Sequence, residues 1–137
     1  MATTSQYVSQ PLLEVSQLTA ANTNRDGSGT LVTVAAALAT AAAAGVGKRI
    51  NRVTICASVT TTAGVVRFFV SSNSGTDKRL VLEKIIAAVT PSTTIPVVRI
   101  ECPELAGLVL TGGSTSLLYA STHNAEAMTI LVESGTL

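Results

Sequence analysis

The chain has one histidine, His123, in the polar segment Ser121-Thr122-His123-Asn124. An imidazole beside a hydroxyl is the pairing that general-base and nucleophilic catalysis use. A catalytic triad also needs a nucleophile on a strained turn and a carboxylate that orients the ring, and the sequence has no Gly-x-Ser-x-Gly motif. A small hydrolase that uses His123 therefore stays an alternative, and a hydrogen-bonding loop residue is the favoured interpretation.

A second set of residues has the spacing of a calcium-binding loop. Asn22, Asn24, Asp26 and Gly27 are in phase with the pattern D-x-[DN]-x-[DN]-G. The first position is Asn rather than Asp, and no closing Glu follows at the required distance. Because Asn, Asp and Gly favour tight turns without any metal, the segment predicts a turn, and neither a metal nor a cofactor is expected.

The carboxylates and cysteines add no further motif. The eight acidic residues are scattered, so none forms the acid/base pair of a glycosidase. Two Phe and two Tyr offer few platforms for stacking on sugars, which disfavours a carbohydrate-binding module. Cys56 and Cys102 lack the spacing of zinc ligands. Two free thiols inside strands are the favoured interpretation, and a disulfide between them stays open.

The low charge of the chain limits its partners. Of the 137 residues, 12% are charged and 47% are hydrophobic, with a net charge of +1. This balance lacks the basic footprint of a nucleic-acid-binding protein. The surface is either rich in Ser and Thr or partly buried against copies of the chain or a partner. The polar segment Met1–Gln10 has no signal-peptide pattern and predicts a flexible arm at residues 1–10.

Short apolar segments separated by turn residues fill the rest of the chain. They recur about every ten residues, which is typical of an antiparallel sandwich or barrel. Ala35–Ala44 is ambiguous, and we expect an Ala-rich loop or a single helical turn there rather than a membrane span. The expected strands are Leu12–Leu18, Thr30–Ala36, Ile50–Val59, Val65–Val70, Arg79–Ala88, Val97–Cys102, Ser116–Ser121 and Ala127–Glu133.

The sequence therefore predicts an all-β fold. We expect a single antiparallel β-sandwich or barrel of about eight strands over residues 11–137, jelly-roll-like, although the strand count does not establish strand order. Some strands are apolar on both faces. In Gly64–Val70, for example, Val65 and Phe69 alternate with Val66 and Phe68. A second covered face indicates either the centre of a layered sandwich or a subunit interface.

Three blocks of sequence resemble small virion structural proteins of tailed bacteriophages. They are Ala-Asn-Thr-Asn-Arg-Asp-Gly-Ser-Gly-Thr at residues 21–30, Thr-Thr-Thr-Ala-Gly-Val-Val-Arg-Phe-Phe-Val at 60–70 and Ala-Ser-Thr-His-Asn-Ala-Glu at 120–126. The resemblance extends over about Ala21–Ser134. The Ala-rich segment Ala35–Ala44 departs from it.

The resemblance implies a non-enzymatic capsid decoration (cement) protein. Its partners would be the major capsid protein and further copies of itself, with a trimer expected by analogy with threefold positions in shells, and neither nucleic acid nor membrane. It would be made in the bacterial cytoplasm and reside on the capsid surface. A tail, neck or fibre subunit is the alternative virion part. The candidate interface residues are Gln6, Tyr7, Val8, Arg25, Arg67, Phe69, His123 and Asn124.

Overall fold

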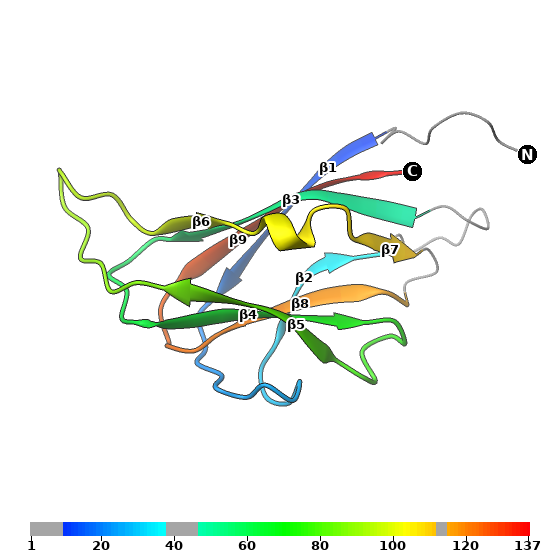
Figure 1. The fold of residues 1–137 in the computed structure, drawn as a ribbon, viewed down its shortest axis with the longest axis horizontal. Helices are drawn as coiled ribbons and strands as arrows, with labels where there is room; N and C mark the ends of the chain where they lie inside the picture. The colour runs from blue at the N-terminus through cyan, green and yellow to red at the C-terminus, as the bar shows by residue number, and fades with distance from the viewer. Residues whose placement is uncertain (1–9, 38–46, 112–114) are drawn as a thin grey trace, which may run out of the picture.

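The structure, a computed structural model, describes residues 10–37, 47–111 and 115–137. Over these residues the chain forms two antiparallel sheets that pack face to face (Figure 1). Sheet A has the order β1-β9-β3, and two short strands, β6 and β7, share the far edge of β3. Its strands are β1 (Gln10–Leu18), β3 (Gly47–Ala57), β6 (Arg99–Glu101), β7 (Val109–Thr111) and β9 (Met128–Thr136).

Sheet B has the order β2-β8-β4-β5. The register between β2 and β8 shifts after Thr33, and that between β4 and β5 shifts after Phe68. Its strands are β2 (Val32–Ala36), β4 (Gly64–Ser71), β5 (Arg79–Ile86) and β8 (Leu117–Thr122). A single 3-10 turn, η1 (Pro103–Leu105), separates β6 from β7.

The strand order is that of a jelly roll. The first strand pairs with the last (β1 with β9), the second with the next to last (β2 with β8), β3 with the interrupted strand β6–β7, and β4 with β5. A long hairpin rolled across two sheets produces this set of pairs, which gives eight strand positions when β6 and β7 count as one. The predicted all-β class and jelly-roll-like sandwich are therefore confirmed.

Alternation along the strands builds the core between the sheets. Val53 and Ile55 of β3 face Val66 and Phe68 of β4 across the interior, and all four are 0% exposed. At one end of the interior the ammonium group of Lys48 forms an ion pair with Glu14 and donates a hydrogen bond to the Ala36 carbonyl oxygen (2.8 Å). The cation is 4% exposed and lies between the two sheets.

The sequence located eight strands to within a few residues. Strand β7 was missed, because the prediction placed no strand between Cys102 and Ser116. Gln10, expected as the last residue of the arm, is the first residue of β1. Ala35 and Ala36 belong to β2, and most of the ambiguous Ala-rich segment, residues 38–44, lies outside the described residues. In the part of the chain that the structure describes, no helix is long and apolar enough to cross a membrane.

Candidate functional site

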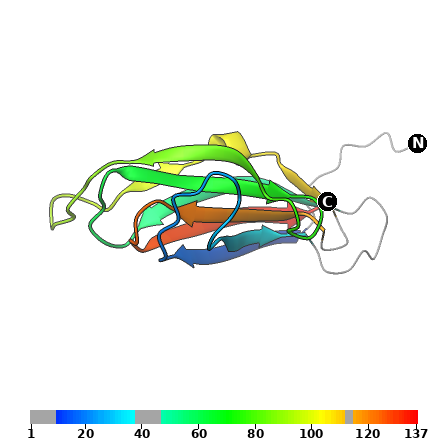
Figure 2. The same cartoon turned by 90° about the horizontal axis from the view of Figure 1, so that it is seen from below.

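The segment between β1 and β2, residues 19–31, crosses the outer face of sheet B, and we call it the covering loop (Figure 2). It first joins β8, where Ala21 forms a parallel bridge with Thr122 and the Asn22 N–H donates to the Thr122 carbonyl oxygen (2.8 Å). It then reaches β5, where Arg25 pairs with Glu83. The loop therefore spans three of the four strands of this sheet.

Asn22 holds the covering loop together from inside. Its side-chain oxygen accepts the Asn24 N–H (3.0 Å), and its amide nitrogen donates to the carbonyl oxygens of Ser28 (3.0 Å) and Thr30 (2.9 Å). Asp26 accepts two hydrogen bonds from Ser28, which lower the pKa of the Asp26 carboxyl. The residues with calcium-loop spacing thus bond to the loop itself, as the turn interpretation predicts. No group of three or more metal-ligating side chains occurs among the described residues.

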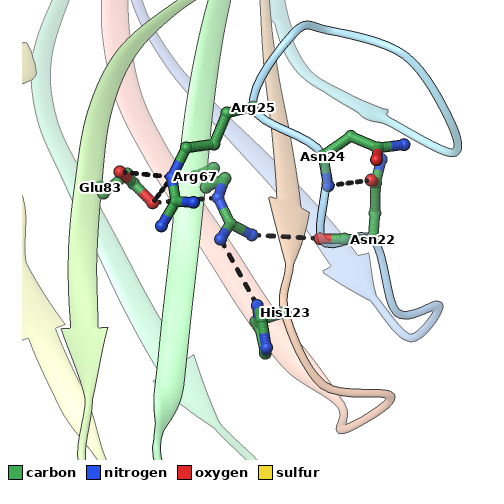
Figure 3. Close-up of polar contacts among 6 residues, drawn as sticks. All are labelled: Asn22, Asn24, Arg25, Arg67, Glu83 and His123. Atoms are coloured by element: carbon green, nitrogen blue, oxygen red, sulfur yellow. Dashed lines mark hydrogen bonds and ion pairs between the residues drawn. The ribbon is translucent and has the colours of Figure 1, made fainter.

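A buried arginine lies beneath the covering loop. Arg67 points from the outer face of β4 and is 1% exposed (Figure 3). Its guanidinium group donates to Glu83 (Nε to Oε2, 3.0 Å) and to the Asn22 carbonyl oxygen (Nη1 to O, 3.2 Å). A buried cation is tolerated where its donors find acceptors. Arg67 therefore fastens the loop to the sheet.

Glu83 joins the two arginines. It lies opposite Arg67 in the β4–β5 register. Both of its carboxylate oxygens also accept from Arg25 Nε at 3.1 Å. The hydrogen bond from Arg25, followed by the positive charges of Arg25 and Arg67, lowers the pKa of the Glu83 carboxyl below its ordinary value. The carboxylate is thus the link between a loop cation and a sheet cation.

Apolar side chains and a close glycine contact lie next to Arg67 on the outer face of sheet B. Phe69, on the same outward face as Arg67, is 0% exposed, and its neighbour across the sheet, Tyr119, is 8% exposed. The Lys78 ammonium lies 5.2 Å from the centre of the Tyr119 ring, within range of a cation–π interaction. Gly27 has φ +86°, and a Cβ there would lie 2.5 Å from the Lys78 carbonyl oxygen. Only glycine allows this approach.

The two remaining candidate residues lie at one end of this region. His123 Nδ1 is 3.4 Å from Arg67 Nη2, so the imidazole faces a guanidinium cation (Figure 3). The Asn124 amide donates to the carbonyl oxygens of Thr62 (3.4 Å) and Ala63 (3.3 Å). Both residues therefore bond to their own domain, as the interpretation of His123 as a loop residue predicts.

The structure brings Arg25, Arg67 and His123 into one polar cluster. Arg67 and Phe69 are buried within the chain, and Arg67 bonds to the covering loop. The candidates with exposed surface are therefore Arg25, His123 and Asn124. Gln6, Tyr7 and Val8 lie outside the described residues. Sequence reasoning missed Glu83. The signal that identifies it is its position opposite Arg67 once the β4–β5 hairpin is in register.

The outer face of sheet A differs from that of sheet B. Leu13 and Val15 point outward from β1 and are 63% and 60% exposed. Arg52 forms ion pairs with Glu101 (3.6 Å) and Glu133 (3.3 Å) farther across the face. A shallow groove of about 380 Å³ extends from β1 over β9 to β3, lined by Pro11, Leu12, Leu13, Asn51, Glu133 and Ser134.

Both cysteines are free thiols, as the sequence favoured. Cys102 is 1% exposed, and burial raises the pKa of its thiol to about 11. The Cys56 thiol lies 3.7 Å from the Ala57 carbonyl oxygen.

Comparisons with known proteins identify no family. No protein-family model matches the sequence, and no curated protein matches it. Among solved structures, a chain of the T13 IBDV viral particle has a TM-score of 0.35 and 13% identity, covering 97% of this chain and 33% of that chain. A chain of infectious bursal disease virus Gt strain has a TM-score of 0.28 and 14% identity, covering 99% and 32%. The protein spans about a third of either viral chain, and at these TM-scores the likenesses assign no function.

Proposed function

We propose that this protein is a non-enzymatic virion component, and specifically a decoration (cement) protein that binds the outside of a capsid. The observation that carries the proposal is the jelly-roll strand order, an architecture used by viral capsid domains as well as by lectins and cupins. The sequence resemblance to phage virion proteins selects the capsid role from this set.

The distribution of polar and apolar groups supports a binding role. The polar cluster around Arg67 bonds to the domain's own loop, whereas apolar side chains on β1 remain exposed. A cement protein acts by contact, and it stabilises a shell because it binds the assembled state in preference to free subunits. The partners in this proposal are the major capsid protein and further copies of the chain, and the expected trimer stays a prediction. Synthesis in the bacterial cytoplasm and residence on the capsid surface belong to the same proposal.

Copy number in purified virions tests the proposal. Quantitative mass spectrometry should find hundreds of copies that scale with the major capsid protein. A few to a few dozen copies would assign the protein to the tail, neck or a fibre instead. Its absence from virions would reject the virion role, and a glycan array would then test the carbohydrate-binding alternative.

The segment 1–10 offers a finer test of attachment. In the decoration proposal this segment reaches a neighbouring subunit, so its deletion should lower occupancy on capsids. Occupancy equal to that of the full chain would reject the arm as an attachment element while leaving the decoration role in place. The thermal unfolding midpoint of the shortened chain serves as the control for folding.

A further inference from the structure

The two sheets have four edges among the described residues, and three of them are protected. Strand β2 is five residues long and its pairing shifts register, and β6 and β7 have three residues each. Strand β5 carries Arg79, Glu83 and Lys84. Shortness, irregular pairing, charge and proline are among the means by which proteins prevent a sheet edge from pairing with another chain.

Strand β1 is the least protected edge. It is nine residues long, pairs with β9 in unbroken register, contains no Lys or Arg, and has a single proline, Pro11, that cannot donate a backbone hydrogen bond. Its one charged residue, Glu14, is neutralised by the ion pair with Lys48. The C-terminal half of β1 lies against sheet B, where Ser16 Oγ donates to the Thr33 carbonyl oxygen (3.4 Å). Among the described residues nothing pairs with the outer edge of the N-terminal half, so this half is the part of β1 that could receive another strand.

The outward side chains of this half are uncharged. Pro11, Leu13 and Val15 alternate with the inward residues Leu12 and Glu14. Pro11 and Leu13 also line the 380 Å³ groove. A twofold axis through Leu13, perpendicular to the sheet, places Leu13 opposite its copy and Pro11 opposite Val15. The outward positions on both sides of Leu13 are apolar, so antiparallel pairing with a second copy brings no like charges together in this row.

We propose that two copies of the chain pair antiparallel through the N-terminal half of β1, centred on Leu13, so that two A sheets become one continuous sheet. A register centred on Glu14 would set two carboxylates directly opposite each other, which is unfavourable. The contact is isologous, as in most closed dimers. It does not depend on binding to a capsid, but it is an alternative to the expected trimer. Copies held close together on a shell would pair more readily because their effective concentration is raised.

Cysteine cross-linking tests the register. In a Cys56→Ser background, Leu13→Cys should form a disulfide between copies when oxidised glutathione accepts the two electrons, because directly opposite residues have Cα atoms about 4.5–5.5 Å apart. The matched control is Val81→Cys, an outward position on β5 that is 50% exposed. We expect at least roughly tenfold more covalent dimer from Leu13→Cys. Equal yields from the two variants would overturn the proposal.

Sedimentation equilibrium tests the association without cysteine chemistry. A contact of one strand is small, so the dimer should be weak and appear at high protein concentration. We expect the apparent mass to rise from 14.0 kDa toward twice that value, and Leu13→Glu to abolish the rise. A chain that stays monomeric throughout, a trimer, or a dimer unaffected by Leu13→Glu would each reject β1 pairing. Both experiments use free protein, so they succeed or fail separately from the copy-number measurement.

Discussion

The outer faces of the two sheets both carry apolar side chains, but these side chains differ in how far they are exposed to solvent. On sheet B, Arg67 is 1% exposed beneath the covering loop and Phe69 beside it is 0% exposed, whereas Ile85 on the edge strand β5 is 79% exposed. On sheet A nothing among the described residues covers Leu13 and Val15, which are 63% and 60% exposed. An apolar outward row in a strand can therefore be part of the fold or a surface for another molecule. Whether a connecting loop crosses such a row is one factor that determines if it is buried within the fold or stays open to another molecule.

The largest loss of folding stability should come from removing the buried arginine, Arg67. Arg67→Ala removes the donors to Glu83 and Asn22 and leaves a cavity under the covering loop, so we expect a loss of about 3 kcal/mol in the free energy of unfolding. Arg25→Ala is the matched control, because Arg25 binds the same carboxylate with its side chain 63% exposed. It should cost about 1 kcal/mol or less. Equal losses in urea titrations would show that burial of Arg67 does not matter.

A smaller loss should follow from forcing the loop away from the sheet. Gly27→Ala forces an alanine into the left-handed backbone conformation and brings its Cβ into contact with the Lys78 carbonyl oxygen. We therefore expect the free energy of unfolding to fall by about 2 kcal/mol. Gly107→Ala shares the positive φ (+88°), but its nearest atom is 3.9 Å away. It should cost about 1 kcal/mol. The difference between the two thermal midpoints measures the loop contact, and no difference would show that the loop accommodates the methyl group.

Acid should weaken the covered face through Glu83. Because the pKa of Glu83 is lowered in the folded protein, its contribution is complete above the unfolded value of about 4.3 and is lost as the pH falls through the folded pKa. Glu83→Gln should therefore give a shallower fall in stability between about pH 5 and pH 2.5. Chemical unfolding at several pH values checks this, and an unchanged pH slope would contradict it.

The smallest effect should come from the open face. Val15→Ser replaces an exposed apolar side chain on β1, so the dilute monomer should change in stability by less than about 0.5 kcal/mol. Replacement by serine at a buried position on sheet B, Phe69→Ser, should lower the free energy of unfolding by about 3 kcal/mol or more. A large loss from Val15→Ser at low protein concentration would mean that the row on β1 is part of the monomer's own core.

Local patterns predicted the strands well and their outer environment poorly. Alternation in Ile50–Val59 located β3, because a strand's inward row must be apolar. The segment Arg79–Ala88, which is apolar on both faces, located β5. The short strand β7 has three residues and follows a 3-10 turn, so its pattern is too brief to detect. The strand order became visible only in the structure, because it depends on pairs as distant in sequence as Gln10 and Thr136.

The candidate site was predicted in part for the same reason. Arg25, Arg67 and His123 were selected from separate sequence blocks, and the fold brings them together. Glu83 was not selected, because a carboxylate in an apolar strand gives no sign of its partner until the hairpin register is known. The two-faced apolar pattern of β4 suggested a layered centre or an interface, and the actual cover is the chain's own loop.

The rolled-hairpin order also has a consequence for synthesis on the ribosome. Strand β9 lies between β1 and β3, and β8 lies between β2 and β4, so each sheet has a late strand at its centre. A nascent chain that ends before β8 holds the halves of both sheets without the strands that join them. Such non-local pairing folds slowly and leaves edges exposed meanwhile. We therefore expect the domain to fold only once β8 and β9 have left the ribosome, rather than strand by strand as the earlier strands appear.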